Sequence, residues 1–240
     1  DMKYLFLHII LFIGLIANAQ QTPAKRQTEK VTIQGATLHL GNGKVIENAY
    51  IAFENGVLTL VADATVSRID VTKFNKVIPI EGQHVYPGFI APNSSLGLVE
   101  TDAIRAQNDL YEVGTFKPSV RSVIAYNADS EIIPTVRSNG VLLGQITPRG
   151  GIISGSSSVM QFDAWNWEDA AYKIDVGIHL NWPNMSISKS PPGPSEEEQK
   201  NSIEKALLEI RNLFKDAEAY NKIKNHEPKN LHLEAMRELF

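Results

Sequence analysis

Three short strand-like segments, joined by Asn-Gly turns, restrict the first third of this chain to an antiparallel sheet. Residues 31–40 alternate apolar and polar side chains, and the largely apolar residues 45–53 and 57–62 are predicted as the second and third strands. The connections contain Asn-Gly dipeptides at 42–43 and 55–56, and this pair tolerates the positive φ of a tight hairpin. The sequence therefore predicts a β-meander, which needs a second layer to cover its apolar face.

The pattern changes after a fourth apolar run at residues 77–80. Strand-like runs lie at 141–147, 159–162 and 173–182, and a short helix is expected to open at 165–169, between the last two. Strand, helix and strand in alternation are typical of parallel βα units. We therefore expect a second domain of α/β class after the meander.

A long helix is predicted near the end of the chain. Ser195 followed by Glu198 forms a capping box, and the helix is expected to run from 195 toward 224. Its apolar side chains recur at helical spacing and are expected to be core rather than a cofactor site. These residues are Ile203, Leu207, Ile210 and Phe214.

The junction between the two patterns reads Tyr86-Pro-Gly-Phe-Ile-Ala-Pro-Asn-Ser-Ser95. It resembles the point in the amidohydrolase superfamily where a small β-domain meets the first strand of a (β/α)8 barrel, written Pro-Gly-(Phe/Leu)-Ile-Asp-x-His-x-His. Residues 87–90 match that pattern. Ala91 stands in place of the aspartate, and Asn93 and Ser95 stand in place of the two metal-binding histidines.

The resemblance implies a fold class and a domain plan. It implies an α/β protein with an incomplete β-sandwich-type domain at 31–86 and the first part of a (β/α)8 TIM barrel at 87–240. A closed barrel takes about 250 residues, and only about 150 follow residue 86. We therefore expect either the N-terminal part of a longer protein or a chain that needs a partner barrel to complete its fold.

The replacement of His-x-His changes the chemistry expected at the barrel mouth. A catalytic zinc site needs imidazole ligands, and the oxygens of Asn93 and Ser95 suit harder cations and hydrogen bonds. These two side chains either satisfy local backbone groups or line a reshaped pocket with one metal or none. The family's remaining ligands come from later strands, so the chain carries no evident metal ligand of its own, although the full-length protein could hold zinc or another divalent metal.

A second candidate site is Pro148-Arg149-Gly150-Gly151 and the stretch that follows it to Ser158. It is expected to be a loop at the end of a strand, and it is similar to the Pro-x-Gly-Gly-x-Ile-Ser-Gly stretch of imidazolonepropionase-like amidohydrolases. Arg149 could clamp a carboxylate or phosphate while Gly150 and Gly151 allow close backbone approach. The alternative is a structural turn with a solvated arginine.

The six histidines include no pair at metal-ligand spacing. His179, late in a strand, either lines a pocket or is an ordinary packed histidine. The chain has no cysteine, which excludes disulfides, thiolate sites and cysteine nucleophiles. Its net charge of −4 argues against nucleic acid as a partner.

The N-terminus has the pattern of a secretory signal peptide. A lysine at position 3 precedes an apolar run over residues 4–16, and Ala17-Asn-Ala19 supplies the small residues that a signal peptidase recognises. We expect cleavage after Ala19, a flexible lead-in at 20–30, an exported (periplasmic or secreted) protein, and no membrane contact once the signal is removed.

Two functions follow from these expectations. The first is an exported amidohydrolase-like protein, the family's chemistry being metal-assisted hydrolysis of a C–N bond in a small amide or cyclic amide. On this hypothesis the present chain is a fragment that is inactive alone. The alternative is a non-catalytic amidohydrolase-fold subunit that binds a ligand or pairs with another barrel.

Overall fold

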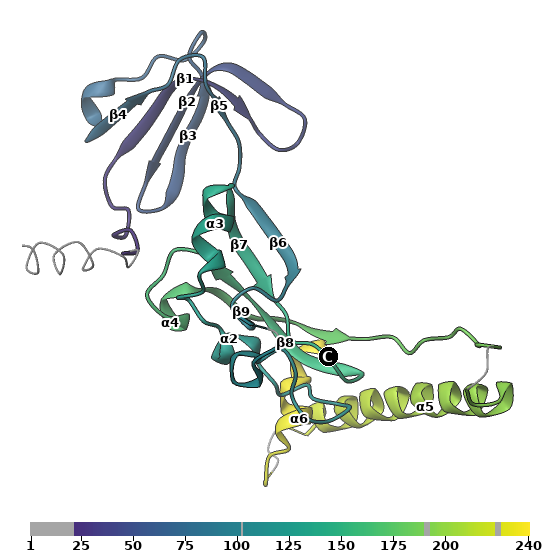
Figure 1. Ribbon diagram of the computed structural model, residues 1–240. Coiled ribbons are helices and arrows are strands. Elements are labelled where there is room, and N and C mark those ends of the chain that lie inside the picture. Colours follow the sequence, from purple (N-terminus) through teal and green to yellow (C-terminus); the bar gives the residue numbers. More distant parts are fainter. Residues whose placement is uncertain (1–21, 102, 190–192, 224–226) are drawn as a thin grey trace, which may run out of the picture. The chain divides into compact units, whose positions relative to one another are not determined.

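The computed structural model describes residues 22–101, 103–189, 193–223 and 227–240. Figure 1 shows two compact units, which divide between Pro87 and Gly88. The expected signal peptide, its cleavage point, His8 and His226 lie outside the described residues. Within the described part of the chain, no helix has the length and apolar character needed to cross a membrane.

The first unit is built on one five-stranded sheet. Its strands have the order β3-β2-β1-β4, with β5 also paired to β1. Their bounds are Val31–His39 (β1), Val45–Glu54 (β2), Val57–Asp63 (β3), Lys76–Pro79 (β4) and His84–Val85 (β5), with a 3-10 helix η1 at Val71–Lys73. Strands β1 to β3 form the antiparallel meander that the sequence predicts, while β4 and β5 run parallel to β1.

One face of this sheet carries the small core of the unit. Leu38, Ala49 and Ile51 are buried, and they are flanked by half-buried aliphatic side chains. The turn between β2 and β3 takes Asn55 and Gly56 through φ angles of 53° and 74°, which explains the Asn-Gly sequence. The described residues of this unit form one sheet and no second one.

The second unit contains a four-stranded sheet and all the described α-helices. The strands are β6 (Phe89–Ser94), β7 (Val141–Ile146), β8 (Ile153–Gln161) and β9 (Ala171–Leu180). The helices are α2 (Ser122–Ala125), α3 (Ile132–Ser138), α4 (Trp167–Ala170), α5 (Glu196–Asn221) and α6 (Leu231–Ala235), with 3-10 turns η2 (Arg105–Gln107) and η3 (Arg237–Leu239).

The prediction of parallel βα units is correct for the first pair of strands and wrong for the rest. Strands β6 and β7 are parallel, but β7, β8 and β9 follow one another antiparallel. The segment 153–158, expected to be part of a loop, is the first two-thirds of β8. Its glycine is required because segment 115–121 lies against it: a Cβ on Gly155 would lie 2.4 Å from the Val120 carbonyl oxygen.

The core of the second unit lies between this sheet and the short helices. It contains Leu98, Val123, Tyr126, Ile133, Ile146, Met160, Phe162 and Ala170. Trp167 packs against this cluster, whereas Trp165 is exposed. Ile146, the last residue of β7, belongs to this core, so the core reaches the strand end that precedes the Arg149 loop.

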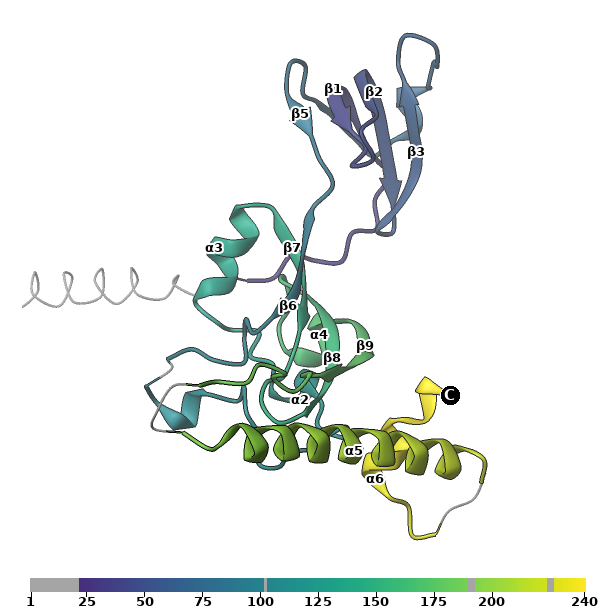
Figure 2. The ribbon, with the colours of Figure 1, turned by 90° about the vertical axis from the view of Figure 1, so that its right-hand side faces the viewer.

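Helix α5 begins with the predicted capping box of Ser195 and Glu198. In both views it runs across one end of the sheet, with α6 beside its C-terminal half (Figures 1 and 2). The expectation that its apolar stripe is core is only partly correct, because Ile210 is buried while Ile203, Leu207 and Phe214 are half-buried. The helix instead buries Ala217 and Tyr220 near its end.

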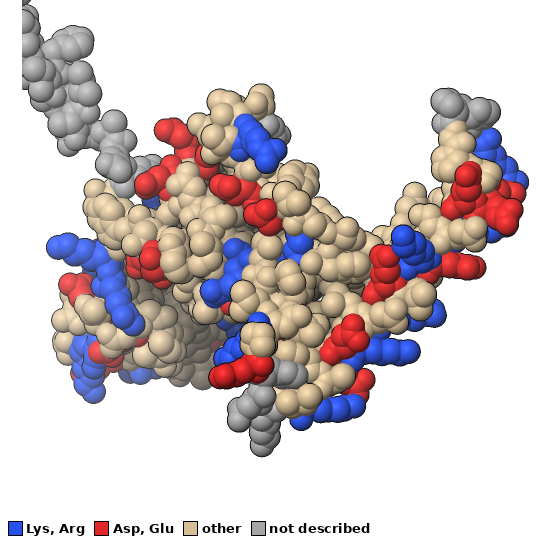
Figure 3. Space-filling model, turned by 90° about the horizontal axis from the view of Figure 1, so that it is seen from below, with Lys and Arg blue, Asp and Glu red and all other residues tan. Residues whose placement is uncertain are grey.

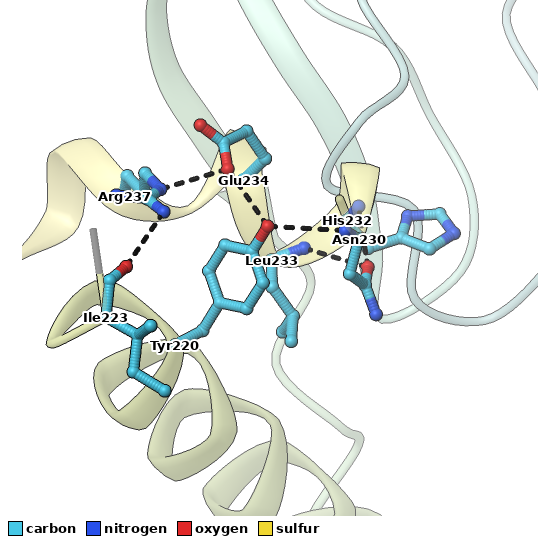
Figure 4. A network of polar contacts seen from close by, with 7 residues as sticks. All are labelled: Tyr220, Ile223, Asn230, His232, Leu233, Glu234 and Arg237. Carbon is cyan, nitrogen blue, oxygen red and sulfur yellow. Dashed lines mark hydrogen bonds and ion pairs between the residues drawn. The ribbon is translucent and has the colours of Figure 1, made fainter. Parts of the chain in front are cut away.

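A polar network joins the end of α5 to α6 and η3 (Figure 4). The hydroxyl of Tyr220 donates to Glu234 Oε2 at 3.0 Å and accepts from the main-chain N–H of Asn230 at 3.2 Å. Arg237 donates to the same Glu234 oxygen at 3.0 Å and lies over the Tyr220 ring. These contacts fix the last described turns of the chain against α5.

Candidate functional site

Asn93 lies at a β-bulge near the end of β6. The register with β7 shifts between Ala91, which faces Gly144, and Ser94, which faces Ile146, so β6 has one residue more than its partner. Asn93 takes up this extra residue with φ at 51°, a left-handed conformation that asparagine tolerates better than most residues. Its side chain is thereby directed away from the regular alternation of the strand.

Arg149, in the loop after β7, binds Asn93 at two points. Its Nη1 donates to Asn93 Oδ1 at 2.8 Å, and its Nη2 donates to the Asn93 main-chain oxygen at 2.7 Å. A guanidinium has five N–H donors, so these two bonds leave the others available. The structure thus brings together two residues that the sequence identified separately, and Arg149 is a positioned cation rather than a freely solvated one.

A chain of hydrogen bonds continues from Asn93 across the sheet. Gln145 Oε1 accepts from the Asn93 main-chain N–H at 3.3 Å, and Gln145 Nε2 donates to Ser157 Oγ at 3.0 Å. Ser157 is fully buried, and Gln145 is half-buried. Gln145 was not predicted, because a glutamine inside an apolar strand carries no motif, and Ser157 was named only as part of the stretch that follows Gly151.

The loop that carries Arg149 is fixed by close contacts. Gly150 and Gly151 have φ angles of 79° and 68°, and a Cβ on Gly151 would lie 2.7 Å from the Thr115 carbonyl oxygen. Lys117 is 2% exposed, and its ammonium donates to the main-chain oxygens of Glu112 at 2.8 Å and Arg149 at 3.4 Å. Burial lowers the pKa of Lys117. The two glycines therefore serve close packing of this loop, with the buried lysine beneath it.

His179 lies in β9 opposite Gly155 of β8 and is half-buried. Burial lowers the pKa of His179 below its usual 6.5, and the positive charge of Arg149 lowers it further. The neutral form of the imidazole is therefore favoured. It offers one donor and one acceptor without adding charge.

Ser95 lies outside this group. Strand β6 ends at Ser94, and the Ser95 carbonyl accepts from the Leu98 N–H at 3.0 Å in the following turn. The bulge and the early strand end mean that residues 93 and 95 are not alternate positions of one regular strand. Of the predicted residues, Asn93 and Arg149 are in direct contact, and Gly150 and Gly151 follow Arg149 in the same loop, whereas His179 makes none of the described hydrogen bonds to them.

The donors at this site do not fit a zinc ion. The Asn93 amide oxygen is already bonded to a guanidinium, whose fixed positive charge opposes a dication. Within the described residues no group of three or more histidine, cysteine, aspartate or glutamate side chains is placed to hold a metal. The arrangement suits an anion, because the half-buried Arg149 guanidinium has N–H groups beyond those that bind Asn93.

A second polar cluster lies in the same unit and was not predicted. Asp175 lies at a register shift in β9 and has a φ angle of 49°. Its carboxylate forms an ion pair with Arg121: Nε donates to Oδ2 at 2.8 Å, and Nη2 lies 2.7 Å from the same Oδ2 atom. Ser156 Oγ donates to the other Asp175 oxygen at 2.9 Å. The cluster borders a pocket of about 470 Å³ between β9 and α6. An aspartate within a strand-like run was the only available signal for it.

No protein-family model and no curated protein matches this chain. Among solved structures, it is similar to an amidohydrolase from Thermotoga maritima MSB8, with a TM-score of 0.66 and 19% sequence identity. The likeness covers 86% of this chain and 54% of that one, so the chain spans about half the length of the solved structure. The likeness shows the fold alone: this mixed α/β chain with two sheets has a fold similar to that of about half of an amidohydrolase chain.

Proposed function

We propose that this chain is part of an exported amidohydrolase-like protein whose Asn93–Arg149 site binds a small amide-type molecule through a carboxylate. The observation that carries the proposal is the pair of hydrogen bonds from Arg149 to Asn93. They hold the guanidinium against Asn93, the residue that stands in place of the first histidine of the amidohydrolase motif Pro-Gly-(Phe/Leu)-Ile-Asp-x-His-x-His. On this proposal the chain is a binding subunit that does not hydrolyse the amide alone.

The site offers the recognition that such a ligand needs. A carboxylate accepts two parallel N–H bonds from a guanidinium, and pre-positioning lowers the entropy lost on binding. The neutral His179 supplies a donor or acceptor for the amide group without competing for the negative charge. Export is supported by the signal-peptide pattern of residues 1–19.

Completion of the fold by a further barrel segment or a partner barrel belongs to the same proposal. Strand β6 is an edge strand of its sheet in the described part of the chain, and Phe89 and Ile90 on it are 64% and 58% exposed. An uncovered parallel edge with apolar side chains is unfavourable in water. We propose that an incomplete (β/α)8 barrel is closed over this edge.

The second candidate function is metal-assisted hydrolysis of a C–N bond by the completed protein. It is supported by the similarity to an amidohydrolase that is about twice as long as the matched part. The zinc or other divalent metal would then be held by residues outside this chain. Arg149 would bind the substrate rather than take part in metal binding.

Titration calorimetry with N-acetylglycine tests the proposed binding. We expect wild-type protein to bind it and to bind the uncharged N-methylacetamide far more weakly. Replacing Arg149 with methionine should weaken N-acetylglycine binding by about tenfold or more, since a charge-assisted hydrogen bond contributes about 1.5–3 kcal/mol. Arg149→Lys keeps the charge and should retain part of the affinity.

Two results would change the assignment. Equal affinity of wild type and Arg149→Met for N-acetylglycine would show that Arg149 does not bind the carboxylate. Release of glycine from N-acetylglycine by this chain alone would show that the chain is an enzyme and not only a binding subunit. An unrelated protein of similar net charge, free of this site, sets the background heat.

A further inference from the structure

Two histidines that are 45 residues apart in the chain meet in the first unit. Nε2 of His39, the last residue of β1, lies 2.9 Å from Nδ1 of His84, the first residue of β5. The two strands are parallel, with Thr37 opposite His84 and Leu38 opposite Val85. Their registered pairing brings the imidazoles together, which no local sequence spacing could have indicated.

The pair is held by aromatic packing and remains open to solvent. The Tyr86 ring stacks on His39 with centroids 4.2 Å apart and an interplanar angle of 9°. The two imidazoles are themselves stacked, 5.2 Å apart. His84 is exposed and His39 half-buried. The two nitrogens are therefore fixed by strands and stacking, and a solute can reach them.

The separation of the nitrogens matches a chelate geometry. Metal–imidazole bonds are about 2.0–2.1 Å long, so two nitrogens 2.9 Å apart subtend an angle of about 90° at a shared metal. That angle is the one between neighbouring ligands in square-planar or tetragonal coordination, which copper(II) and nickel(II) prefer. Tetrahedral zinc prefers a wider angle between ligands.

We propose that His39 and His84 form a binding site for a tetragonal divalent transition metal, copper(II) above nickel(II) and zinc(II). In the metal-free pair the N–H of one facing nitrogen donates a hydrogen bond to the other nitrogen. On binding, the donating ring moves that proton to its other nitrogen, and both facing nitrogens then give a lone pair to the metal. Solvent supplies the remaining ligands. The affinity order follows the general preference of nitrogen ligands for copper(II).

Copper(II) titration followed by electron paramagnetic resonance tests this site. Wild-type protein should bind one copper ion with two equatorial imidazole nitrogens. His39→Gln and His84→Gln should each weaken copper binding by at least about tenfold. Loss of a group that only hydrogen-bonds to a metal ligand already costs about tenfold in metal affinity, and loss of a ligand should cost no less. His232→Gln, at an exposed histidine in the second unit, is the matched control and should bind as the wild type does.

The result that overturns the proposal is copper binding of equal strength in all four proteins, or a spectrum without two imidazole nitrogens in the wild type. A wild-type spectrum without two imidazole nitrogens decides the question even if a variant fails to fold. Circular dichroism of each metal-free variant shows whether the variant is folded. Nickel(II) and zinc(II) titrations then test the order, and zinc binding tighter than copper would contradict the tetragonal geometry.

Discussion

Arg149 binds Asn93 through both the side-chain amide and the main-chain carbonyl, at 2.8 and 2.7 Å. The loop after β7 is thereby attached to the bulge in β6. The two strands are neighbours in the sheet, so the bond also stabilises their C-terminal ends. The predictions that follow depend on this contact and on the backbone conformations around it.

A double-mutant cycle should measure the side-chain part of this contact. We expect Asn93→Ala and Arg149→Met to show a coupling free energy of about 1 kcal/mol, because a charged donor at a half-buried position loses part of its strength to solvent. The cycle cancels the backbone strain that alanine suffers at the left-handed φ of residue 93. Urea unfolding of the four proteins gives the value, and additive effects would show that the two side chains do not interact.

Replacing Gly151 with alanine should destabilise the second unit more than the same change at Gly140. Both glycines have φ angles in the left-handed region, 68° and 87°, so both substitutions cost about 1 kcal/mol in backbone energy. A Cβ at Gly151 also clashes with the Thr115 carbonyl oxygen, whereas the nearest atom at Gly140 is 3.8 Å away, on Phe89. Thermal unfolding compares the two, and an equal loss would show that the 111–117 segment moves aside freely.

Asp175 should be sensitive to the kind of replacement it receives. Asp175→Ala loses the bonds to Arg121 and Ser156 and retains a strained φ, at a total of about 2 kcal/mol. Asp175→Gly loses the same bonds without the strain, so it should recover about half of that cost. Chemical denaturation measures both variants. A glycine variant that is less stable than the alanine variant would contradict the role given to backbone strain.

The pKa of His179 predicts a pH-dependent loss of stability. Burial, aided by the Arg149 charge, lowers this pKa in the folded protein below the value of 6.5 for the unfolded chain. The unfolded state therefore binds the proton first, and stability falls as the pH decreases from 6.5 through the folded-state pKa. His179→Gln should flatten the unfolding free energy in this range, and Arg149→Met should flatten it partly. An unchanged pH profile in His179→Gln would exclude the effect.

The sequence predicts the first sheet well because its signals are local. Alternation in β1, strand-like apolar runs in β2 and β3, and Asn-Gly turns specify these strands without reference to distant residues. Only the end of the antiparallel β8, residues 159–161, was predicted as strand, because the residues before it are rich in serine and glycine, which is typical of a loop. Gly155 is needed there because the Val120 carbonyl oxygen lies against it, and this is a tertiary reason that no local pattern contains.

The candidate site was predictable residue by residue but not as an arrangement. Asn93 and Arg149 were each identified by their position in a motif, yet 56 residues separate them and only the bulge in β6 brings them into contact. Gln145 and Ser157 have meaning only as neighbours of that pair. The His39–His84 contact has the same origin, since parallel pairing of β1 with β5 creates it.

Zinc binding measured by equilibrium dialysis tests the central claim most directly. It is best done in the His39→Gln background, so that the imidazole pair of the first unit does not contribute. We predict that this protein retains no zinc that depends on residue 93, because the Arg149 guanidinium holds Asn93. One retained zinc per chain that is lost in the Asn93→Ala variant would contradict the account and establish a metal centre at this site.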